Sequence, residues 1–451
     1  MTPGAEPGSG FNWPEALCAP VRELPDHTRL WVALSGGLDS TLLLHLAVHC
    51  HGRSGAVRAI HINHQLQFNA SDTESFCRDE CERLGVPLVV ERVTVAAGDD
   101  FGVAGGIEEA ARKARYSSFE SLVQRGDLLL MAHHGDDQAE TVLFRMLRGS
   151  GVAGLAGMPA SRALGPAILV RPLLGFERDE LERWARSAGL SWVDDPSNID
   201  QRFDRNFLRH SVLPPLRERW PGLNRRLRHT AESCAESEAL NRKLAALQWQ
   251  AVGGDQDRLP VAGLKTLSLT EQKNLIRWWV RERGFHAPTI GDWQQVIQDL
   301  LFAGEDREPE FRSDGFSLRR YQGDVYLVPD RLPLSEVPIA LEPGPGLYFG
   351  EWFLRLEPVV TPERPLPPIR ISTRQGGERV RFHPEGQSKS LKKWFQELAV
   401  PPWERARLPL VFAGSGEAVE LIAIGDLWCS EQYSGGAHAA GWRLVVEREC
   451  D

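Results

Sequence analysis

Short apolar runs alternate with amphipathic stretches along the first two hundred residues. Strands are predicted at Leu30–Leu34, "VRAIHINH" (57–64), "VPLVVERV" (86–93) and "LLLMA" (128–132). Helices are predicted at Ser40–His51, Ser71–Leu84, Ile107–Val123 and Asp136–Leu147, with a glycine-rich loop near Gly98–Gly106. Because apolar strands separated by helical stretches form right-handed βαβ units, we predict an α/β fold with a doubly wound parallel sheet.

The pattern changes after Trp192. Residues 216–301 are mostly helical in pattern, and prolines then cluster between Pro329 and Pro368 around the strand-like "LYFGEWFLRLEP". The remainder, Ile369–Val446, mixes short strands with one helix near Leu391–Leu398. We therefore predict an α/β domain (1–215), a helical middle domain (216–330), a proline-rich linker (331–365) and a small α+β carboxyl-terminal domain (366–451).

Composition narrows the class of protein. With 42% hydrophobic and 25% charged residues, no run of 18 apolar residues and no secretion signal in the first twenty, we expect a soluble cytoplasmic protein without a membrane partner. The seven cysteines include no C-x-x-C, and Cys77 and Cys81 are expected to be reduced thiols. A net charge of −9 argues against generic nucleic-acid binding, although it says nothing about local patches.

The turn after the first strand is suited to an anion. In "VALSGGLDST" (32–41), Gly36 and Gly37 allow positive φ and can direct backbone N–H groups inward, with a helix start behind them. Ser35, Ser40 and Thr41 add hydroxyl donors, and Asp39 could hold a Mg²⁺ that offsets phosphate charge. A capped helix after a tight turn is the simpler alternative, and the Walker A pattern is absent.

A second cluster follows the fourth strand, in "AHHGDDQAET" (132–141). Helical spacing pairs His133 with Asp137 and Asp136 with Glu140, so three carboxylates and an imidazole crowd one turn. Helix capping would explain one carboxylate but not Glu140. Carboxylates grouped near an anion-binding turn suit either Mg²⁺ or a substrate ammonium group.

The motifs resemble those of a known family. S-G-G-x-D-S at 35–40 is similar to the pyrophosphate-binding loop of the PP-loop ATP pyrophosphatase superfamily, whose domain is Rossmann-like. "AHHGDDQAETVLFRMLRGSGVAGLAGM" (132–158), "WVDDPSNIDQRFDRNFLRH" (192–210) and "SLKKWFQELAVPPWERARLPLVF" (390–412) resemble signatures of the tRNA(Ile)-lysidine synthetase family. The glycines of "GSGVAG" (149–154) follow a helix rather than a strand, so they are not a dinucleotide fingerprint.

The resemblance implies a ligase that forms a carbon–nitrogen bond. ATP would adenylate carbon 2 of the wobble cytidine in an isoleucine tRNA with a CAU anticodon, and the ε-amine of L-lysine would then displace AMP. The loop residues Ser35, Gly36, Gly37, Leu38, Asp39 and Ser40 would bind ATP, with Asp39 as the Mg²⁺ ligand. Asp136, Asp137 and Glu140 would receive the lysine ammonium or the metal, and spacing does not assign these roles individually.

Further residues are candidates for substrate contacts. Arg112 and Arg115 lie on one predicted helix and could contact nucleotide or lysine, although a solvated basic face is an equal alternative. His133 belongs to the same candidate set. His64 ends the second strand, where ATP-binding folds contact adenine, although a structural histidine is nearly as plausible. Arg205 and Asn206, in a matched signature, are candidates for RNA or active-site contacts.

Two basic patches are predicted to hold the tRNA. Residues 202–229 contain eight Lys or Arg against two acids, and residues 370–410 contain nine against four, with Trp394, Phe395 and Trp403 interleaved. Basic and aromatic side chains can contact phosphates and stack on unpaired bases, although core packing is the better explanation for any single aromatic such as Phe395. The tRNA-binding candidates are Arg205, Asn206, Arg209, Lys389, Lys392 and Lys393.

Two alternatives remain at this point. A tRNA thiolase of the same superfamily would also adenylate a base, but such enzymes generally use reactive cysteines, often in a C-x-x-C, which is absent here. A non-catalytic tRNA-binding protein with a vestigial ATP fold is the other, and the intact loop and carboxylate cluster disfavour it.

Overall fold

The computed structural model describes residues 11–52, 56–64, 70–93, 104–194, 200–288, 290–304, 307–335, 337–359, 366–382, 386–415, 419–434 and 441–449. The chain divides into two compact units, Met1–Asn241 and Arg242–Asp451. The glycine-rich loop predicted near Gly98–Gly106 lies mostly outside the described residues.

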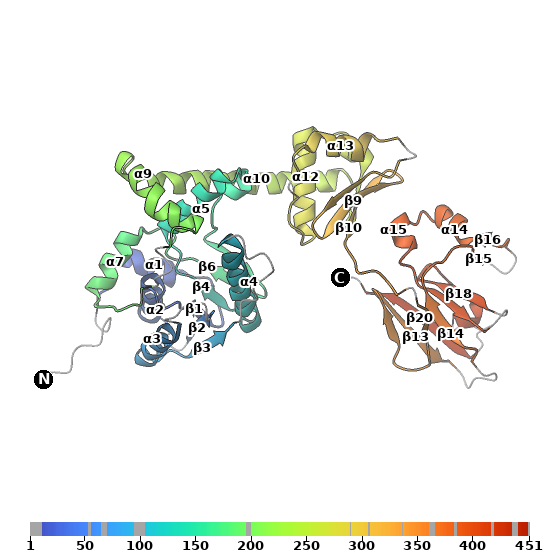
Figure 1. The fold of residues 1–451 in the computed structure, drawn as a ribbon, viewed down its shortest axis with the longest axis horizontal. Helices are drawn as coiled ribbons and strands as arrows, with labels where there is room; N and C mark the ends of the chain where they lie inside the picture. The colour runs from blue at the N-terminus through green and yellow to red at the C-terminus, as the bar shows by residue number, and fades with distance from the viewer. Residues whose placement is uncertain are drawn as a thin grey trace. The chain divides into compact units, whose positions relative to one another are not determined.

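The first unit is built on a six-stranded sheet in the order β3-β2-β1-β4-β6-β5 (Figure 1). Its strands are β1 (Leu30–Ala33), β2 (Val57–Asn63), β3 (Leu88–Arg92), β4 (Leu128–Leu130), β5 (Ser161–Leu164) and β6 (Ala167–Val170). All neighbouring strands are parallel except β5 and β6, which form an antiparallel pair. The predicted doubly wound parallel sheet is confirmed.

The first unit also contains α1 (Glu15–Arg22), α2 (Leu38–Cys50), α3 (Ala70–Arg83), α4 (Ala104–Leu122), α5 (Gly135–Leu147), α6 (Val152–Leu155), α7 (Arg178–Ser187), α8 (Asp204–Phe207), the π-helical turn η3 (Leu208–Val212) and α9 (Leu213–Arg219). Helix α10 (Leu223–Ala251) begins in this unit. Helices α2, α3, α4 and α5 match the predicted helices to within a few residues, whereas α1 and the β5–β6 hairpin were not predicted.

Both faces of this sheet are covered. Leu30 and Val32 of β1 belong to a core shared with α1, α2 and α7, whereas Trp31 belongs to a second core with Phe119 of α4. Figure 1 shows α4 on the other side of the sheet from α1 and α2. Because consecutive strand residues point to opposite, equally buried faces, β1 and β4 are apolar throughout instead of alternating with polar residues.

The cysteines of the first unit fall into two kinds. Cys77 and Cys81 of α3 are free and buried, as predicted. Cys18 of α1 and Cys50 at the end of α2 form a disulfide, which the sequence did not predict.

The second unit begins with a domain that combines helices and a sheet. It contains β7 (Arg258–Pro260), α11 (Val261–Leu264), α12 (Leu269–Glu282), α13 (Trp293–Phe302), β8 (Glu310–Ser313), β9 (Phe316–Tyr321) and β10 (Asp324–Pro329). The strands form an antiparallel sheet in the order β7-β10-β9-β8, and Phe316 and Leu318 pack in one core with Trp279 of α12. The sequence predicted helices in this part of the chain, and its antiparallel sheet was not predicted.

The last part of the chain is a small α+β domain, as predicted. Its elements are β11 (Ile339–Ala340), β12 (Leu347–Phe349), β13 (Trp352–Pro358), β14 (Ile369–Ser372), β15 (Arg379–Val380), β16 (Lys389–Ser390), α14 (Leu391–Glu397), α15 (Pro402–Arg405), β17 (Leu410–Ala413), β18 (Glu420–Ile424), β19 (Trp428–Cys429), the 3₁₀ turn η4 (Glu431–Tyr433) and β20 (Trp442–Arg448). The sheets run β11-β14-β17-β18-β19, β12-β13-β20 and β15-β16.

The stretch around "LYFGEWFLRLEP" belongs to this domain. Strand β13 pairs with β20 along its whole length, and Trp352 and Leu354 are buried in the same core as Leu444. Part of the segment 331–365, expected to be a linker, therefore contributes structure to the carboxyl-terminal domain. The predicted explanation for Phe395, core packing, is confirmed because its side chain is fully buried.

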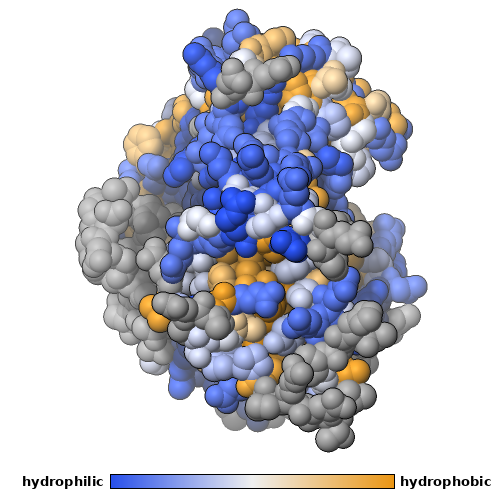
Figure 2. Space-filling view, turned by 90° about the vertical axis from the view of Figure 1, so that its right-hand side faces the viewer, coloured by the Kyte–Doolittle hydropathy of each residue, from blue (hydrophilic) through white to orange (hydrophobic). Residues whose placement is uncertain are grey.

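The surface agrees with the polar composition. Figure 2 shows a face on which hydrophilic side chains predominate and hydrophobic ones form smaller groups. Among the described residues, the helices include none with the length and apolar character needed to cross a membrane.

Candidate active site

A cavity of about 610 Å³ lies at the carboxyl ends of the parallel strands of the first unit. The sheet order reverses between β1 and β4, and ligands of doubly wound folds bind at such a point. The predicted residues that line the cavity are Ser35, Gly37, Leu38, Asp39, Ser40, His64, Arg112, Arg115, His133, Asp137, Arg205 and Arg209. Segments far apart in the sequence thus meet at one pocket, and its size is in the usual range for a small-molecule site.

The loop between β1 and α2 offers unfilled hydrogen-bond donors. The Ser40 hydroxyl accepts from the backbone N–H of Ser35 at 3.1 Å and donates to the carbonyl of Gly37 at 3.0 Å, which closes the turn on itself. Gly37 is the N-cap of α2 and provides no side chain to cap it. Because the first N–H groups of a helix have no partner within it, this end of α2 can bind an anion.

Gly36 is required by the packing beneath the loop. Its φ is +83°, and a Cβ at this position would lie 2.9 Å from Cγ2 of Thr73 and 3.2 Å from Sγ of Cys77, both on α3. Its carbonyl accepts a hydrogen bond from the N–H of Val193 at 2.9 Å. Helix α3 and the "WVDD" segment therefore fix the shape of the loop from two sides.

Asp39 presents an unsatisfied carboxylate oxygen in the cavity wall. Its Oδ1 is buried and has no hydrogen-bond partner among the described residues, and Oδ2 lies 3.7 Å from Nε2 of His134. Burial raises the pKa of Asp39, while His134 acts in the opposite direction. Since an unpaired buried carboxylate oxygen is costly, this atom is suited to a cation.

Asp39 also fits the chemistry of a magnesium site. Among the described residues, no group of three or more His, Cys, Asp or Glu side chains could hold a metal ion. Protein Mg²⁺ sites that serve nucleotides usually use one or two carboxylates and take further ligands from phosphates and water. The single carboxylate of Asp39 beside an anion-binding loop fits this arrangement.

Asp137 lies at the first turn of α5 and faces the cavity. One of its oxygens accepts the backbone N–H of His134 at 3.0 Å, and the same oxygen lies 3.4 Å from Nε2 of that histidine. Its other oxygen accepts a hydrogen bond from Arg209 at 3.1 Å. Burial raises the pKa of Asp137, but His134, including its backbone N–H, and Arg209 outweigh it, so the pKa is lowered and Asp137 is anionic.

Glu140, one turn further along α5, is paired with Arg209 of η3. The guanidinium donates from Nε to Oε1 at 2.6 Å and from Nη2 to Oε2 at 2.9 Å. Glu140 is only 3% exposed and does not line the cavity, whereas Arg209 does. In this structure the carboxylate of Glu140 therefore holds Arg209 at the cavity wall.

Asp136 points away from the cavity. It accepts hydrogen bonds from the backbone N–H of Arg178 at 2.8 Å, from Nη2 of Arg217 at 2.5 Å and from Nδ2 of Asn224 at 3.2 Å. These partners belong to α7, α9 and α10. Asp136 therefore joins three helices to the start of α5, a position that the spacing of the acidic cluster did not reveal.

His133 is held as a neutral imidazole. Burial and the nearby arginines lower its pKa to about 4, although Asp137 opposes them. Nε of Arg171, a buried arginine, donates to its Nδ1 at 3.3 Å, and Nη1 of Arg171 donates to the carbonyl of Pro159 at 2.7 Å. This geometry leaves Nε2 of His133 as the protonated nitrogen.

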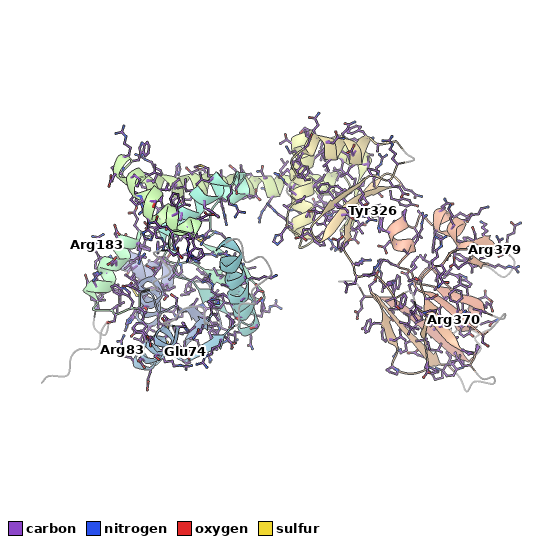
Figure 3. All side chains as sticks on the ribbon, viewed as in Figure 1. Glu74, Arg83, Arg183, Tyr326, Arg370 and Arg379 are labelled. Carbon is purple, nitrogen blue, oxygen red and sulfur yellow. A yellow bond between two sulfur atoms is a disulfide. The ribbon has the colours of Figure 1, made fainter. Side chains whose placement is uncertain are left out.

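A hydrogen-bond network surrounds the buried Glu74 at the end of β2. Glu74 of α3, labelled in Figure 3, accepts hydrogen bonds from Arg92 at 2.9 Å, Arg78 at 2.8 Å and Asn63 at 3.0 Å, and these lower its pKa to about 2. Asn63 lines the cavity next to His64, whose pKa is lowered mainly by burial. Glu74 thus orients the cavity wall where His64 was predicted to contact adenine.

The remaining predicted RNA contacts are divided between the two units. Asn206 donates to the carbonyl of Asp200 at 2.9 Å and does not line the cavity. In the carboxyl-terminal domain, Lys389 pairs with Glu397 at 2.8 Å and lies 4.6 Å above the ring of Trp394, whereas Lys392 and Lys393 are exposed on α14. Arg370 and Arg379 of the same patch lie in this domain (Figure 3).

Several cavity residues were missed from the sequence. His134 contacts both Asp39 and Asp137, and Arg178, Asp194 and Asn63 also line the pocket. The doubled histidine in "HHGDD" could have drawn attention to His134. No pattern in the neighbouring sequence indicates Arg178, because its position at the cavity depends on how α7 packs.

Comparisons with known proteins match this architecture. A family described as "PP-loop domain" matches residues 15–216, "TilS substrate binding domain" matches 259–326 and "TilS substrate C-terminal domain" matches 369–446. The chain is 36% identical to a tRNA(Ile)-lysidine synthase from Coxiella burnetii, covering 96% of both chains. It is 39% identical to one from Alkalilimnicola ehrlichii, covering 96% of this chain and 97% of that one.

A solved structure, the U34-tRNA thiolase NcsA from Methanococcus maripaludis, is 20% identical and covers 51% of this chain and 83% of its own, with a TM-score of 0.40. The family identity rests on the relatives that span nearly the whole chain. With its loop, carboxylates and three matched domains, the chain belongs to the tRNA(Ile)-lysidine synthase family.

Proposed function

We propose that this protein is a ligase that joins L-lysine to the wobble cytidine of a tRNA(Ile) with a CAU anticodon, in the cytoplasm. In the first step the cytosine O2 attacks the α-phosphate of ATP and pyrophosphate leaves. In the second, the lysine ε-amine attacks carbon 2, AMP leaves with the oxygen, and the amine loses a proton. The observation that carries the proposal is one cavity that joins unfilled helix N–H donors, an unpaired Asp39 oxygen and five arginines.

The residues support separate roles in the two steps. The backbone from Ser35 to Ser40 would bind the phosphates that leave as pyrophosphate, and Arg112 and Arg115 would balance negative charge on the nucleotide. Asp39 would hold Mg²⁺, which when bound offsets phosphate charge. Asp137 is the anionic group on α5 that faces the cavity, and it would bind the lysine ammonium.

A sulfur-transfer reaction is less well supported. The cavity lining contains no cysteine among the described residues. Cys77 and Cys81, behind the loop, are buried, and burial raises the pKa of each thiol to about 12. Because the thiolate is the reactive form, these cysteines are poor nucleophiles.

The test is lysine incorporation into RNA. Purified protein, ATP, Mg²⁺ and labelled lysine should add one lysine to a CAU tRNA transcript, and mass spectrometry of the nucleosides should find lysidine. If AMP and pyrophosphate form while the label stays out of the RNA, lysine is not the nucleophile.

A pair of variants tests the role of Asp39. Asp39→Asn should abolish pyrophosphate release, because the replacement removes the charge that a metal needs. Asp79→Asn, an exposed acid on α3, should leave the rate unchanged. Full pyrophosphate release by Asp39→Asn would exclude the metal role.

A further inference from the structure

The eight arginines of residues 202–229 differ in what their side chains contact. Arg205 and Arg209 line the cavity. Three others are engaged within the first unit: Arg202 with Asp200, Arg217 with Asp136, and Arg228 with the Gly175 carbonyl and Glu232. The side chains of Arg219, Arg225 and Arg226 are exposed and make no hydrogen bond or ion pair within the part of the chain that the structure describes.

An exposed tryptophan, Trp220, follows Arg219 in the sequence and precedes Arg225 and Arg226. Trp220 follows the last turn of α9, and Pro221 and Gly222, with φ of +79°, lead from it into α10. All fourteen tryptophans of the chain lie in the described residues. Trp220 is 47% exposed, whereas the other thirteen are buried or half-buried. A large aromatic ring left in water next to unpaired cations is a feature of surfaces that stack on nucleic-acid bases.

We call Arg219, Trp220, Arg225, Arg226 and His229 the corner, and a groove continues from it along the first turns of α10. It has a volume of about 660 Å³ and is lined by Gly175 and by Arg225, Arg226, Arg228, His229, Thr230 and Glu232. Its single acid, Glu232, lies 3.8 Å from Arg228. The charges of Arg225 and Arg226 are therefore not neutralised within the groove.

The corner is attached to α5, the helix whose Asp137 lines the cavity. Arg217 of α9 and Asn224 of α10 both donate to Asp136 at the start of α5, and Asp137 next to it faces the cavity. An anionic chain seated at the corner would thus be held on elements whose position relative to the cavity is fixed by direct hydrogen bonds.

We propose that this corner, formed by Arg219, Trp220, Arg225, Arg226 and His229, binds the tRNA strand next to the nucleotide that enters the cavity. Arg225 and Arg226 contact consecutive backbone phosphates, and Trp220 stacks on an unpaired nucleotide of the anticodon loop. The identity of the RNA rests on the proposed function, whereas the binding of RNA phosphates rests on the geometry alone.

Salt dependence separates the two kinds of contact. Each lost phosphate contact should lower the slope of log Kd against log salt concentration by about 0.7 to 0.9. Arg225→Ala and Arg226→Ala should each weaken binding of the CAU tRNA about three- to tenfold, and the double variant should lower the slope by about 1.5. Trp220→Ala should weaken binding about 5- to 100-fold with the slope unchanged, and Trp220→Phe should retain most of the affinity.

The matched control is Arg125→Ala. Arg125 is an exposed arginine in the turn before β4, at the amino-terminal edge of the sheet, so its removal changes net charge equally without touching the corner. It should leave both affinity and slope as in the wild type. The KM for ATP in pyrophosphate release at saturating tRNA should be unchanged in all variants, which distinguishes RNA phosphates from the phosphates of free nucleotide.

Wild-type affinity and slope in the double arginine variant would overturn the proposal. The binding measurement needs no turnover. Failure of the wild type to incorporate lysine would therefore overturn the proposed function, whereas RNA binding by the corner would still be tested by the affinities. Circular dichroism checks that each variant is folded. If Trp220→Ala does not fold, the variants of the exposed arginines still test the proposal.

Discussion

Replacing Arg209 by methionine should destabilise the first unit in a way that depends on pH. The replacement removes both hydrogen bonds to Glu140 and the one to Asp137, at similar side-chain length. It leaves Glu140 as a buried carboxylate without its partner. Breaking a buried ion pair in this way costs about 3–5 kcal/mol, and because Arg209 is itself 26% exposed we expect about 2–4 kcal/mol at pH 8.

Protonation of Glu140 sets an upper limit on that cost. Burial already raises the pKa of Glu140 above its ordinary value of 4.5 even with Arg209 present, and loss of the arginine should raise it further. Keeping the carboxyl neutral costs about 1.4 kcal/mol for each pH unit above the unfolded pKa. At pH 5.5 the electrostatic part of the loss should therefore be at most about 1.4 kcal/mol. An acid whose folded pKa is raised destabilises the fold at high pH, and this penalty disappears as the pH falls to 4.5.

The measurement is urea unfolding of the full chain at pH 8 and pH 5.5, using the transition that ATP shifts. Arg186→Met is the control, because Arg186 pairs with Glu182 on an exposed face of α7 at 2.6 Å, with side chains 65% and 35% exposed. Its loss should cost about 0.5 kcal/mol or less at both pH values. Glu140→Gln placed in the Arg209→Met background should remove the pH dependence.

A loss from Arg209→Met that is the same at both pH values, or no greater than that of the control, would refute this reasoning. The pair would then be packed but not coupled electrostatically, and the assignment of Glu140 as the group that holds Arg209 would fail.

Three further predictions concern the shape of the site. Gly36→Ala should cost about 1–2 kcal/mol in urea unfolding and raise the KM for ATP, because φ is +83° and the new Cβ would meet Thr73 at 2.9 Å. Since the folded pKa of Glu74 is about 2, the wild type should lose about 1–2 kcal/mol of stability between pH 4.5 and pH 2, and Glu74→Gln should not show this loss. Asp136→Ala should release Arg217 and lower lysine incorporation, measured by label in RNA, more than it changes the KM for ATP.

The elements that position the site were predictable because their causes are local. Apolar runs that are buried on both faces indicate β1 and β4, and paired glycines indicate the loop that follows β1. The topology then brings the ends of the strands together, since parallel neighbours share one edge. The β5–β6 hairpin and the sheet of the middle domain were missed, because their strands are short and their pairing depends on packing.

The roles within the acidic cluster could not be predicted from the sequence. Successive residues of a helix point about 100° apart, so Asp136 and Asp137 necessarily face different neighbours. Which one faces the cavity depends on how α5 packs against α7 and α10. Similarly, Glu140 is 69 positions from its partner Arg209, and no local pattern connects them.

The different surroundings of the arginines in residues 202–229 explain how an acidic chain can bind RNA. Charges farther apart than about 8–10 Å are largely screened at physiological salt, so the net charge of −9 matters less than the cations that actually face the ligand. The sequence of residues 202–229 offers eight cations, but four are already engaged within the fold: Arg202, Arg209, Arg217 and Arg228. At most four remain for phosphates, and the slope of log Kd against log salt from this stretch should be about 3 rather than the value of about 6 or 7 that eight free cations would give. Ion pairing within the fold, more than composition, therefore sets the strength and the salt sensitivity of RNA binding.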